Sequence, residues 1–340
     1  MLVADFSHAL LTLPSTTSAL TPVVEGREVD RLGPGAPPVL FLKDESMGRR
    51  FWEFFTAQIP NPNTRRAYYG AISQFSAWCT RQGIPDIYKI QPIHVAAWVQ
   101  ESGASRSRPT VKQHLAAVRM LFDWLILGQF LAVNPAASVR GPKHSVKRGK
   151  TPVLSSEEMG ELLKSIPTDS VLALRDRALL GVMAYTFARV GAVLDLKIED
   201  YYVQRRRGWL RLHEKGGKVN EIPCHHTLEQ FLDDYLKAAG IEGDPEGPLF
   251  RAWRRGELVP SRLNQSNIHK MIRRRAAAAG IRTKIGCHSF RATGITNYLE
   301  NGGRLEVAQQ MAGHESSRTT GLYDRRGDEI SLDEVERISY

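Results

Sequence analysis

Six side chains follow one another along the second half of the chain in an order that suits chemistry on a phosphodiester. A tyrosine phenol can attack phosphorus and conserve the energy of the broken bond in a covalent ester. Two guanidiniums can hold the non-bridging oxygens, because arginine presents a planar fork of donors to developing negative charge. An acid must protonate the departing sugar oxygen, and histidines can orient groups or exchange protons. The residues available for these tasks are Arg189, Lys215, His288, Arg291, His314 and Tyr323.

The spacing of these residues strengthens the interpretation. His288 and Arg291 are three residues apart in a predicted helix, so both side chains lie on one face and can reach the same phosphate. Each residue alone also has an ordinary structural explanation. Arg189 could be a salt-bridging arginine, His288 a helix cap or packed imidazole, and Tyr323 an amphipathic residue near a helix end. The hypothesis therefore depends on the ordered set.

The second half of the chain also contains the elements that must position these groups. Ser155 and Glu158 have the spacing of a capping box, which predicts the start of a helix. Two alternating stretches flank Gly216-Gly217, which predicts a β-hairpin over Trp209–His213 and Val219–Pro223 that carries Lys215. The other predicted helices are Leu174–Ala188, Leu228–Ala239, Gln265–Ala279, His288–Asn301, Leu305–Met311 and Ser316–Tyr323, with a short amphipathic segment over 331–340.

Residues 51–139 have the pattern of a small helical bundle. Apolar residues recur at helical spacing in a helix with Thr64 as its predicted N-cap, in a second near Ile93–Gln100, and in a third from Thr110 to Gly128. The tryptophans and phenylalanines keep the period of a buried face, so we expect them in the core rather than as platforms for stacked bases. Residues 1–50 are predicted to form an arm of unknown role.

Positive charge is concentrated in one segment. Residues 54–150 contain 13 lysines and arginines but only 3 acids, whereas residues 151–340 contain 28 against 26. Such a segment is typical of proteins that bind the phosphate backbone of nucleic acids, because a merely soluble surface usually mixes both signs. Residues 140–152 are basic and rich in helix breakers, which predicts a linker, either a strap over the backbone or a solvated hinge. The candidate DNA contacts are Lys112, Arg119, Lys143, Lys147, Arg148 and Lys150.

Other classes of protein are disfavoured. The chain is 42% apolar and 24% charged, and no stretch reaches the roughly 18 apolar residues of a membrane span. Three dispersed cysteines argue against a disulfide framework and for a reducing cytoplasm. The Cys224-His225-His226 and Cys287-His288 groups lack the paired spacing of a zinc site, so we expect no metal and no cofactor. The arginine runs 205–207 and 273–275 are either solvated or in contact with phosphates.

The segment Cys287–Tyr323 resembles the carboxy-terminal motif of the tyrosine recombinases, the phage integrase family. It has His-x-x-Arg, then Gly313-His314, then a tyrosine nine residues later. Arg189 within FARVGAVLDL and Lys215 within HEKGGK fit the same pattern, and the resemblance covers essentially residues 54–340. It implies a mainly α, two-domain, C-shaped DNA clamp with a small β-hairpin sheet. Its parts would be a SAM-like core-binding domain (51–139), a linker (140–152), a catalytic domain (153–330) and a tail helix (331–340).

The resemblance also implies a role for each candidate. Tyr323 would form a 3′-phosphotyrosine, and Arg189 and Arg291 would clamp the scissile phosphate. Lys215, rather than Lys218, would protonate the leaving 5′ oxygen. His288 would act on the tyrosine proton, and His314 would hydrogen-bond a non-bridging oxygen.

The same resemblance implies partners. One would be double-stranded DNA with inverted-repeat core sites. The others would be three further copies of the chain, because the family forms a homo-tetramer in the synapse, whereas the chain alone in solution would be a monomer. The tetramer would exchange strands through a four-way junction, and the tail helix would dock on a neighbouring protomer. Two alternatives stay open: a type IB topoisomerase-like enzyme that relaxes DNA, and a DNA-binding protein on a decayed recombinase scaffold.

One position departs from the family pattern. The family often has an acid three residues after the first arginine, where it braces the site, but this chain has Ala192. The nearest acids are Asp195 and Asp200. We expect that one of these or another group supplies the brace, or that the site is looser.

Overall fold

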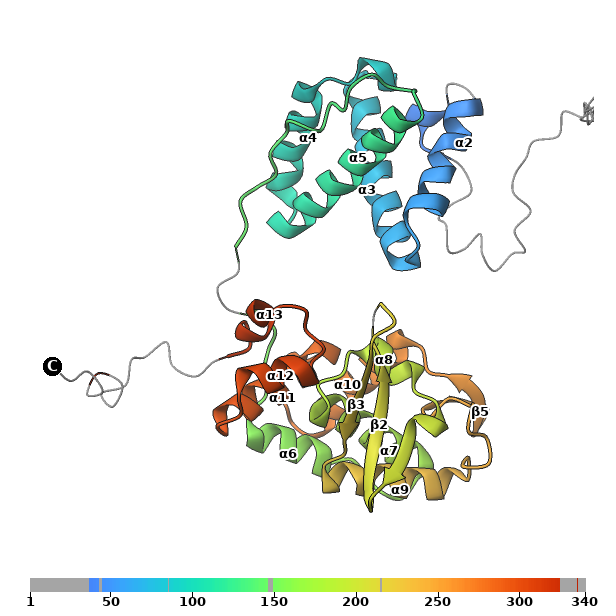
Figure 1. Ribbon diagram of the computed structural model, residues 1–340, viewed down its shortest axis with the longest axis vertical. Helices are drawn as coiled ribbons and strands as arrows, with labels where there is room; N and C mark the ends of the chain where they lie inside the picture. The colour runs from blue at the N-terminus through green and yellow to red at the C-terminus, as the bar shows by residue number, and fades with distance from the viewer. Residues whose placement is uncertain are drawn as a thin grey trace, which may run out of the picture. The chain divides into compact units, whose positions relative to one another are not determined.

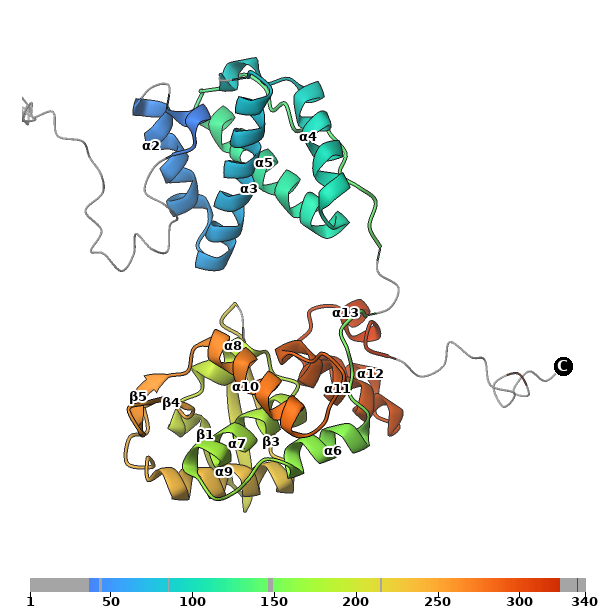
Figure 2. The same cartoon turned by 180° about the vertical axis from the view of Figure 1, so that it is seen from behind.

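The chain divides into two compact units, residues 1–145 and 146–340. The computed structural model describes residues 37–42, 45–84, 86–145, 149–214, 216–324 and 335. Within these ranges the protein is mainly helical, with two small antiparallel sheets in the second unit (Figures 1 and 2). The predicted fold class, mainly α with two domains and a small hairpin sheet, is confirmed. No described helix is long and apolar enough to cross a membrane.

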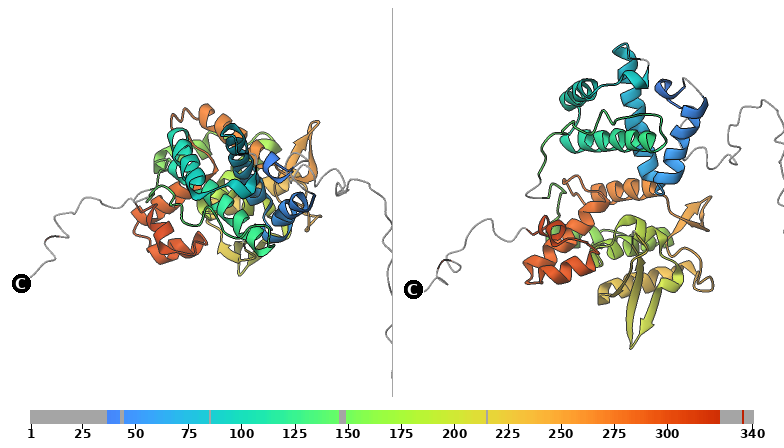
Figure 3. Two further views of the ribbon diagram at one scale, coloured as in Figure 1. Left: turned by 90° about the horizontal axis from the view of Figure 1, so that it is seen from above. Right: turned by 45° about the horizontal axis from the view of Figure 1, so that its top comes forward.

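The described part of the first unit contains helices and no strand (blue to green in Figure 3). Its aromatic side chains form the core as predicted: Phe75, Trp78 and Trp98 are almost fully buried. The helices are α2 (Glu45–Glu53), α3 (Pro62–Arg81), α4 (Pro92–Ser105) and α5 (Arg108–Leu127), with shorter helical turns at Val39–Phe41, Phe54–Gln58 and Ile87–Lys89.

The predicted starts of two of these helices are wrong by two or three residues. Asn61, not Thr64, caps α3, and its side chain accepts hydrogen bonds from the backbone N–H groups of Asn63 and Thr64. Ser107 caps α5, which begins at Arg108, two residues before the predicted start at Thr110. Both helices have a proline in the first turn, where the missing N–H would have no helical partner anyway. The prolines are therefore part of these helices, although the prediction placed them before the helix starts.

The second unit is built around α7 (Val171–Tyr185), in which nearly every residue from Ala173 to Ala184 is buried. A helix that is buried on nearly all sides belongs in a core, and α7 packs against α9 and α11. The other helices are α6 (Ser156–Lys164), α8 (Val190–Asp195), α9 (His226–Ala239), α10 (Gln265–Ala278), α11 (Cys287–Glu300), α12 (Leu305–Met311) and α13 (Ser317–Gly321), with a 3₁₀ turn at Ile198–Asp200. The capping box of Ser155 and Glu158 is confirmed.

The predicted hairpin forms as β2 (Arg207–His213) and β3 (Val219–Pro223), with Leu210 opposite Ile222 and both buried against the core. Three strands were not predicted. β1 (Tyr201–Gln204) pairs with β2, and β4 (Arg251–Arg254) pairs with β5 (Glu257–Arg262) in a second sheet. The turn between β1 and β2 is formed by Arg205 and Arg206, which have positive φ although arginine is not a turn signal. The turn between β4 and β5 is formed by Arg255 and Gly256.

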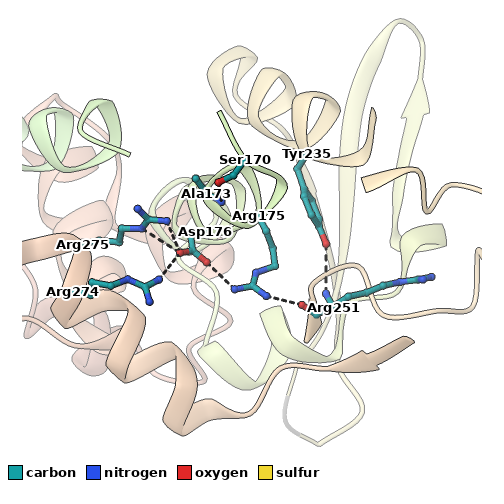
Figure 4. Close-up of polar contacts among 8 residues, drawn as sticks. All are labelled: Ser170, Ala173, Arg175, Asp176, Tyr235, Arg251, Arg274 and Arg275. Atoms are coloured by element: carbon teal, nitrogen blue, oxygen red, sulfur yellow. Dashed lines mark hydrogen bonds and ion pairs between the residues drawn. The ribbon is translucent and has the colours of Figure 1, made fainter. Parts of the chain in front are cut away.

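A buried ion cluster ties several elements of this unit together (Figure 4). Asp176 on α7 is 1% exposed and accepts hydrogen bonds from Arg175, Arg274 and Arg275 at 2.9, 3.1 and 2.8 Å. Arg175 also donates to the backbone oxygen of Arg251 on β4. Two members of the 273–275 arginine run therefore hold α10 to α7.

Candidate active site

Arg291 lies at the centre of the site, on α11, and is 2% exposed. Its guanidinium donates hydrogen bonds to the backbone oxygens of Phe187 and Ala312, which fixes it between the end of α7 and the end of α12. Burial and the neighbouring Arg189 lower the pKa of Arg291 to about 10, so it stays charged near neutrality. A buried, positively charged fork is suited to an anionic oxygen.

The oxygen of Phe187 reaches Arg291 because of two local features. Phe187 has φ of +56°, a left-handed conformation that is rare for a bulky residue and is often found at functional sites. Gly294 on α11 allows close packing here, since a Cβ at that position would lie 2.4 Å from the backbone oxygen of Ala184 and 2.6 Å from the Phe187 ring. The glycine thus permits the contact between α11 and the turn after α7.

Arg189 precedes α8 as its N-cap residue and is partly exposed. Its Nη1 atom donates to Oε2 of Glu214 over 2.5 Å. Glu214 follows β2 directly, and its N–H donates to the oxygen of Lys218 across the turn of the hairpin. Lys215, the predicted acid, lies outside the described residues, while Lys218 forms an ion pair with the exposed Glu315 at 3.2 Å.

His314 and Tyr323 are held beside Arg291 by short polar contacts. Nδ1 of His314 is 2.9 Å from Oγ1 of Thr320, and the imidazole and phenol rings lie parallel. The hydroxyl of Thr296 on α11 donates to the backbone oxygen of Tyr323 over 2.9 Å. The N–H of Gly149 donates to the oxygen of Leu322 over 2.9 Å, so the segment before the tyrosine is fixed on a second side.

Both histidines of the site, His288 and His314, have a lowered pKa, which favours the neutral imidazole. Burial, followed by Arg291 and Arg189, lowers the pKa of His314 to about 4. The same three causes, followed by His269, lower the pKa of His288 on α11. The influence of the two arginines on both imidazoles indicates that these charges lie close together. Five of the six predicted residues are therefore gathered in one place, and the sixth is outside the described ranges.

The two units match two family models. Residues 152–329 match that of the phage integrase family, and residues 50–129 match that of its N-terminal SAM-like domain. The chain belongs to the phage integrase family. This family membership makes it a tyrosine recombinase, an enzyme of site-specific recombination.

Relatives of this phage integrase support the assignment. The tyrosine recombinase XerD of Chlorobaculum tepidum is 31% identical over 277 residues, which cover 77% of this chain and 85% of the relative. The XerH recombinase bound to its difH substrate has the same fold, with a TM-score of 0.63 and 20% identity over 86% of this chain and 84% of that one. A lambda integrase tetramer bound to a Holliday junction gives a TM-score of 0.63 and 19% identity over 84% and 79% of the two chains.

The acid beside the first arginine of this integrase was not found from the sequence. Asp195 forms an ion pair with Arg262, and Asp200 accepts from the backbone N–H of Lys197 and lies 3.1 Å from Nε2 of His213. The assignment of Asp195 or Asp200 as the brace of Arg189 is therefore wrong, and the alternative, that another group supplies it, agrees with the structure. Glu214 contacts Arg189 instead. The one signal for it in the sequence is that it directly precedes Lys215.

The predicted DNA-contact residues of the integrase have different surroundings. Lys112, Lys143 and Lys150 are exposed. Arg119 instead donates to the backbone oxygens of Ala136 and Val139, at 3.2 and 2.6 Å, and so binds its own chain. The remaining two candidates, Lys147 and Arg148, lie outside the described residues, as does all of the predicted tail helix except Val335.

A basic groove of about 860 Å³ on the second unit was also missed. It contains His288 at one side and extends along α10, where Arg273 from the 273–275 run lines it. Arg273 belongs to the 273–275 run that the sequence indicated, whereas the other basic residues of the wall lie outside that run and were not singled out. The basic residues of the wall are His269, Lys270, Arg273, Arg282 and Lys284.

Proposed function

We propose that this integrase cleaves and rejoins DNA strands through a covalent 3′-phosphotyrosine at Tyr323. The observation that carries the proposal is the position of the Tyr323 phenol, which lies parallel to the His314 ring and near enough to Arg291 to contribute to the pKa of that guanidinium. A nucleophile next to a buried guanidinium is the arrangement that attack on a phosphodiester requires.

The proposed reaction proceeds by two transfers of one phosphoryl group. Arg189 and Arg291 bind the non-bridging oxygens while the Tyr323 oxygen attacks phosphorus. The bond from phosphorus to the 5′ oxygen breaks, His288 accepts the phenolic proton, and Lys215 donates a proton to the 5′ oxygen. The 5′-hydroxyl of a second strand then attacks the phosphotyrosine, which restores the phosphodiester and returns the tyrosine.

His314 is suited to hydrogen-bond a non-bridging oxygen. Its lowered pKa makes the ring neutral at pH 7, so one ring nitrogen carries a proton and the other accepts. If Nδ1 accepts from the Thr320 hydroxyl, Nε2 carries the proton and is the donor toward the phosphate. A neutral donor adds no further positive charge next to the two arginines.

The domain roles form part of the same proposal. Residues 51–139 bind one face of the duplex and residues 153–330 the other, joined by the basic linker of residues 140–152. The exposed lysines 112, 143 and 150 bind the phosphate backbone, together with Lys147 and Arg148. A tetramer and a four-way junction are supported by the fold shared with the lambda integrase tetramer on a Holliday junction, and inverted-repeat sites by the fold shared with XerH on a palindromic difH substrate. The tail at 331–340 docks on a neighbouring copy, and the enzyme works in the bacterial cytoplasm.

Nicked suicide substrates test the proposal. Duplexes from DNA flanking the gene, with a nick next to each candidate cleavage point, are incubated with the protein and EDTA and separated on denaturing gels. We expect a covalent protein–DNA band from the native chain and none from Tyr323→Phe. Tyr202→Phe is the matched control, since Tyr202 on β1 packs under Arg211 through its ring. Absence of the band from the native protein on every tiled site would overturn the proposal.

A further inference from the structure

Glu214 occupies a position that joins three parts of the site. Its side chain is 4% exposed, and Oε2 lies 2.5 Å from Nη1 of Arg189 at the start of α8. Its backbone N–H closes the hairpin turn through Lys218 over 2.7 Å. Gly313, next to His314, lies against the same pair, since a Cβ there would be 3.7 Å from Glu214 Cγ and 3.9 Å from Arg189 Nη1.

The electrostatics of the site require a group of this kind. Two guanidiniums, Arg189 and Arg291, lie near each other and repel, and the second is buried. The Arg189 side chain is 37% exposed, and without a partner it could adopt many rotamers. A buried carboxylate holds it with a charge-assisted hydrogen bond and compensates part of the positive charge. The second oxygen, Glu214 Oε1, is buried and accepts no hydrogen bond from any described residue, so the pair with Arg189 is the principal polar contact of this carboxylate.

Other acids near Arg189 do not compete for this role. Ala192, one helical turn along α8 and able by spacing to face Arg189, offers only a methyl group. As described above, Asp195 pairs with Arg262 and Asp200 with His213. Glu214, on the hairpin, therefore supplies the carboxylate for Arg189 that α8 lacks at Ala192.

We propose that Glu214 is the positioning residue that aims Arg189 at the scissile phosphate and fixes it relative to the hairpin turn that carries Lys215. This inference rests on the proposed function, because it assigns Glu214 to the same phosphoryl transfer. Groups that orient a residue in direct contact with the reacting atoms typically change activity about 10- to 100-fold when they are lost. Glu214 itself does not touch the phosphate.

The first measurement compares Glu214→Gln with the native protein on the suicide substrate. The rate of covalent-complex formation should fall about 10- to 100-fold, whereas non-covalent binding of an intact site should stay within about threefold, because the effect is on transition-state stabilisation. Glu221→Gln is the matched control, since Glu221 lies on β3 of the same sheet in an exposed pair with Arg211. An unchanged rate for Glu214→Gln would overturn the inference.

A double-mutant cycle separates positioning from a fold defect. In an Arg189→Ala background, Glu214→Gln should cost no further rate, because the residue that it aims is gone. A general defect of the hairpin would lower the rate by the same factor in both backgrounds, and that result would contradict the inference.

The outcomes also distinguish this inference from the proposed function. Covalent complex from the native protein with an unaffected Glu214→Gln variant would remove the positioning role alone. No covalent complex from the native protein on any tiled site would remove the proposed function, and the inference with it.

Discussion

The imidazole of His314 lies parallel to the phenol of Tyr323, with ring centroids 5.9 Å apart and planes inclined by 6°. The two residues come from the loop after α12 and from the turn after α13, and Thr320 bonds to both, by its hydroxyl to the imidazole and by its carbonyl to the Tyr323 N–H. The proposed nucleophile and the proposed donor to the phosphate are thus positioned by the same threonine.

The depressed pKa of His314 predicts a loss of stability in acid. Its pKa is about 4 in the folded protein and about 6.5 for an unperturbed histidine, so between these limits the unfolded chain binds more protons. The free energy of unfolding should therefore fall as the pH is lowered from 6.5 toward 4. His288 contributes in the same direction.

Urea denaturation at pH 7.5 and pH 5 measures this effect. The native protein should lose on the order of 2 kcal/mol more than His314→Gln over that interval. His226→Gln, at an exposed site on α9, should behave as the native protein does. Equal losses in native protein and His314→Gln would contradict the assignment.

Gly294→Ala should damage both stability and catalysis. The new methyl group would collide with the Ala184 oxygen and the Phe187 ring, and overpacking of this kind costs about 1–3 kcal/mol. Displacement of Phe187 also moves the oxygen that holds Arg291. Thermal unfolding and the covalent-complex assay measure the two effects. Gly160→Ala on α6, where a Cβ meets nothing within 4 Å, should instead be neutral or slightly stabilising.

Asp176→Asn should be strongly destabilising. It leaves Arg175 and Arg275, which are largely buried, without their carboxylate, and breaking a buried pair costs about 3–5 kcal/mol. Chemical denaturation should show a lower midpoint at an unchanged m-value. The comparison is Asp234→Asn, whose partially exposed pair with Arg177 should contribute about 1 kcal/mol or less. A small effect at Asp176 would mean that the cluster is not stabilising.

The basic groove along α10 predicts salt-dependent binding. Lys270→Ala should weaken binding of all DNA sequences and reduce the slope of log K against log salt by about 1, as expected for one lost phosphate contact. Titrations between 50 and 200 mM salt, roughly the range over which such contacts weaken, measure this. Lys164→Ala on α6 is the control. An unaltered slope would place the groove outside the DNA interface.

Gly149→Ala should slow cleavage without unfolding the protein. A Cβ at Gly149 would lie 2.7 Å from the oxygen of Leu322 and so would displace the residue before the nucleophile. A displacement of about 1 Å can cost up to about 100-fold in rate. We expect reduced covalent complex with normal melting temperature, and native behaviour from Gly141→Ala, where the nearest atoms are 3.5 Å away.

Sequence patterns predicted what is local in this protein. The hairpin of β2 and β3, the capping box at Ser155, and α12 over Leu305–Met311 match the structure because alternation and helical spacing report burial within one element. β1 was missed because arginines form its turn to β2, and β4 and β5 were missed although Gly256 lies in the turn between them.

The residues proposed to act on the phosphate could be predicted from the sequence. The residues that position them could not. Glu214 and Arg189 are 25 positions apart, and no period links a helix cap to a strand end. The left-handed Phe187 and the close approach at Gly294 are likewise consequences of tertiary packing. Family resemblance located the gap at Ala192, but only the three-dimensional arrangement identified the residue that fills it.

The contact between Glu214 and Arg189 has a consequence for how such sites can change over evolution. One carboxylate is sufficient for the arginine, and two in the same place would repel each other. Positions 192 and 214 should therefore covary: where one of them is an acid, the other can be a small residue. In an alignment of relatives, the exchange would appear as paired substitutions in α8 and in the hairpin, with the arginine itself unchanged.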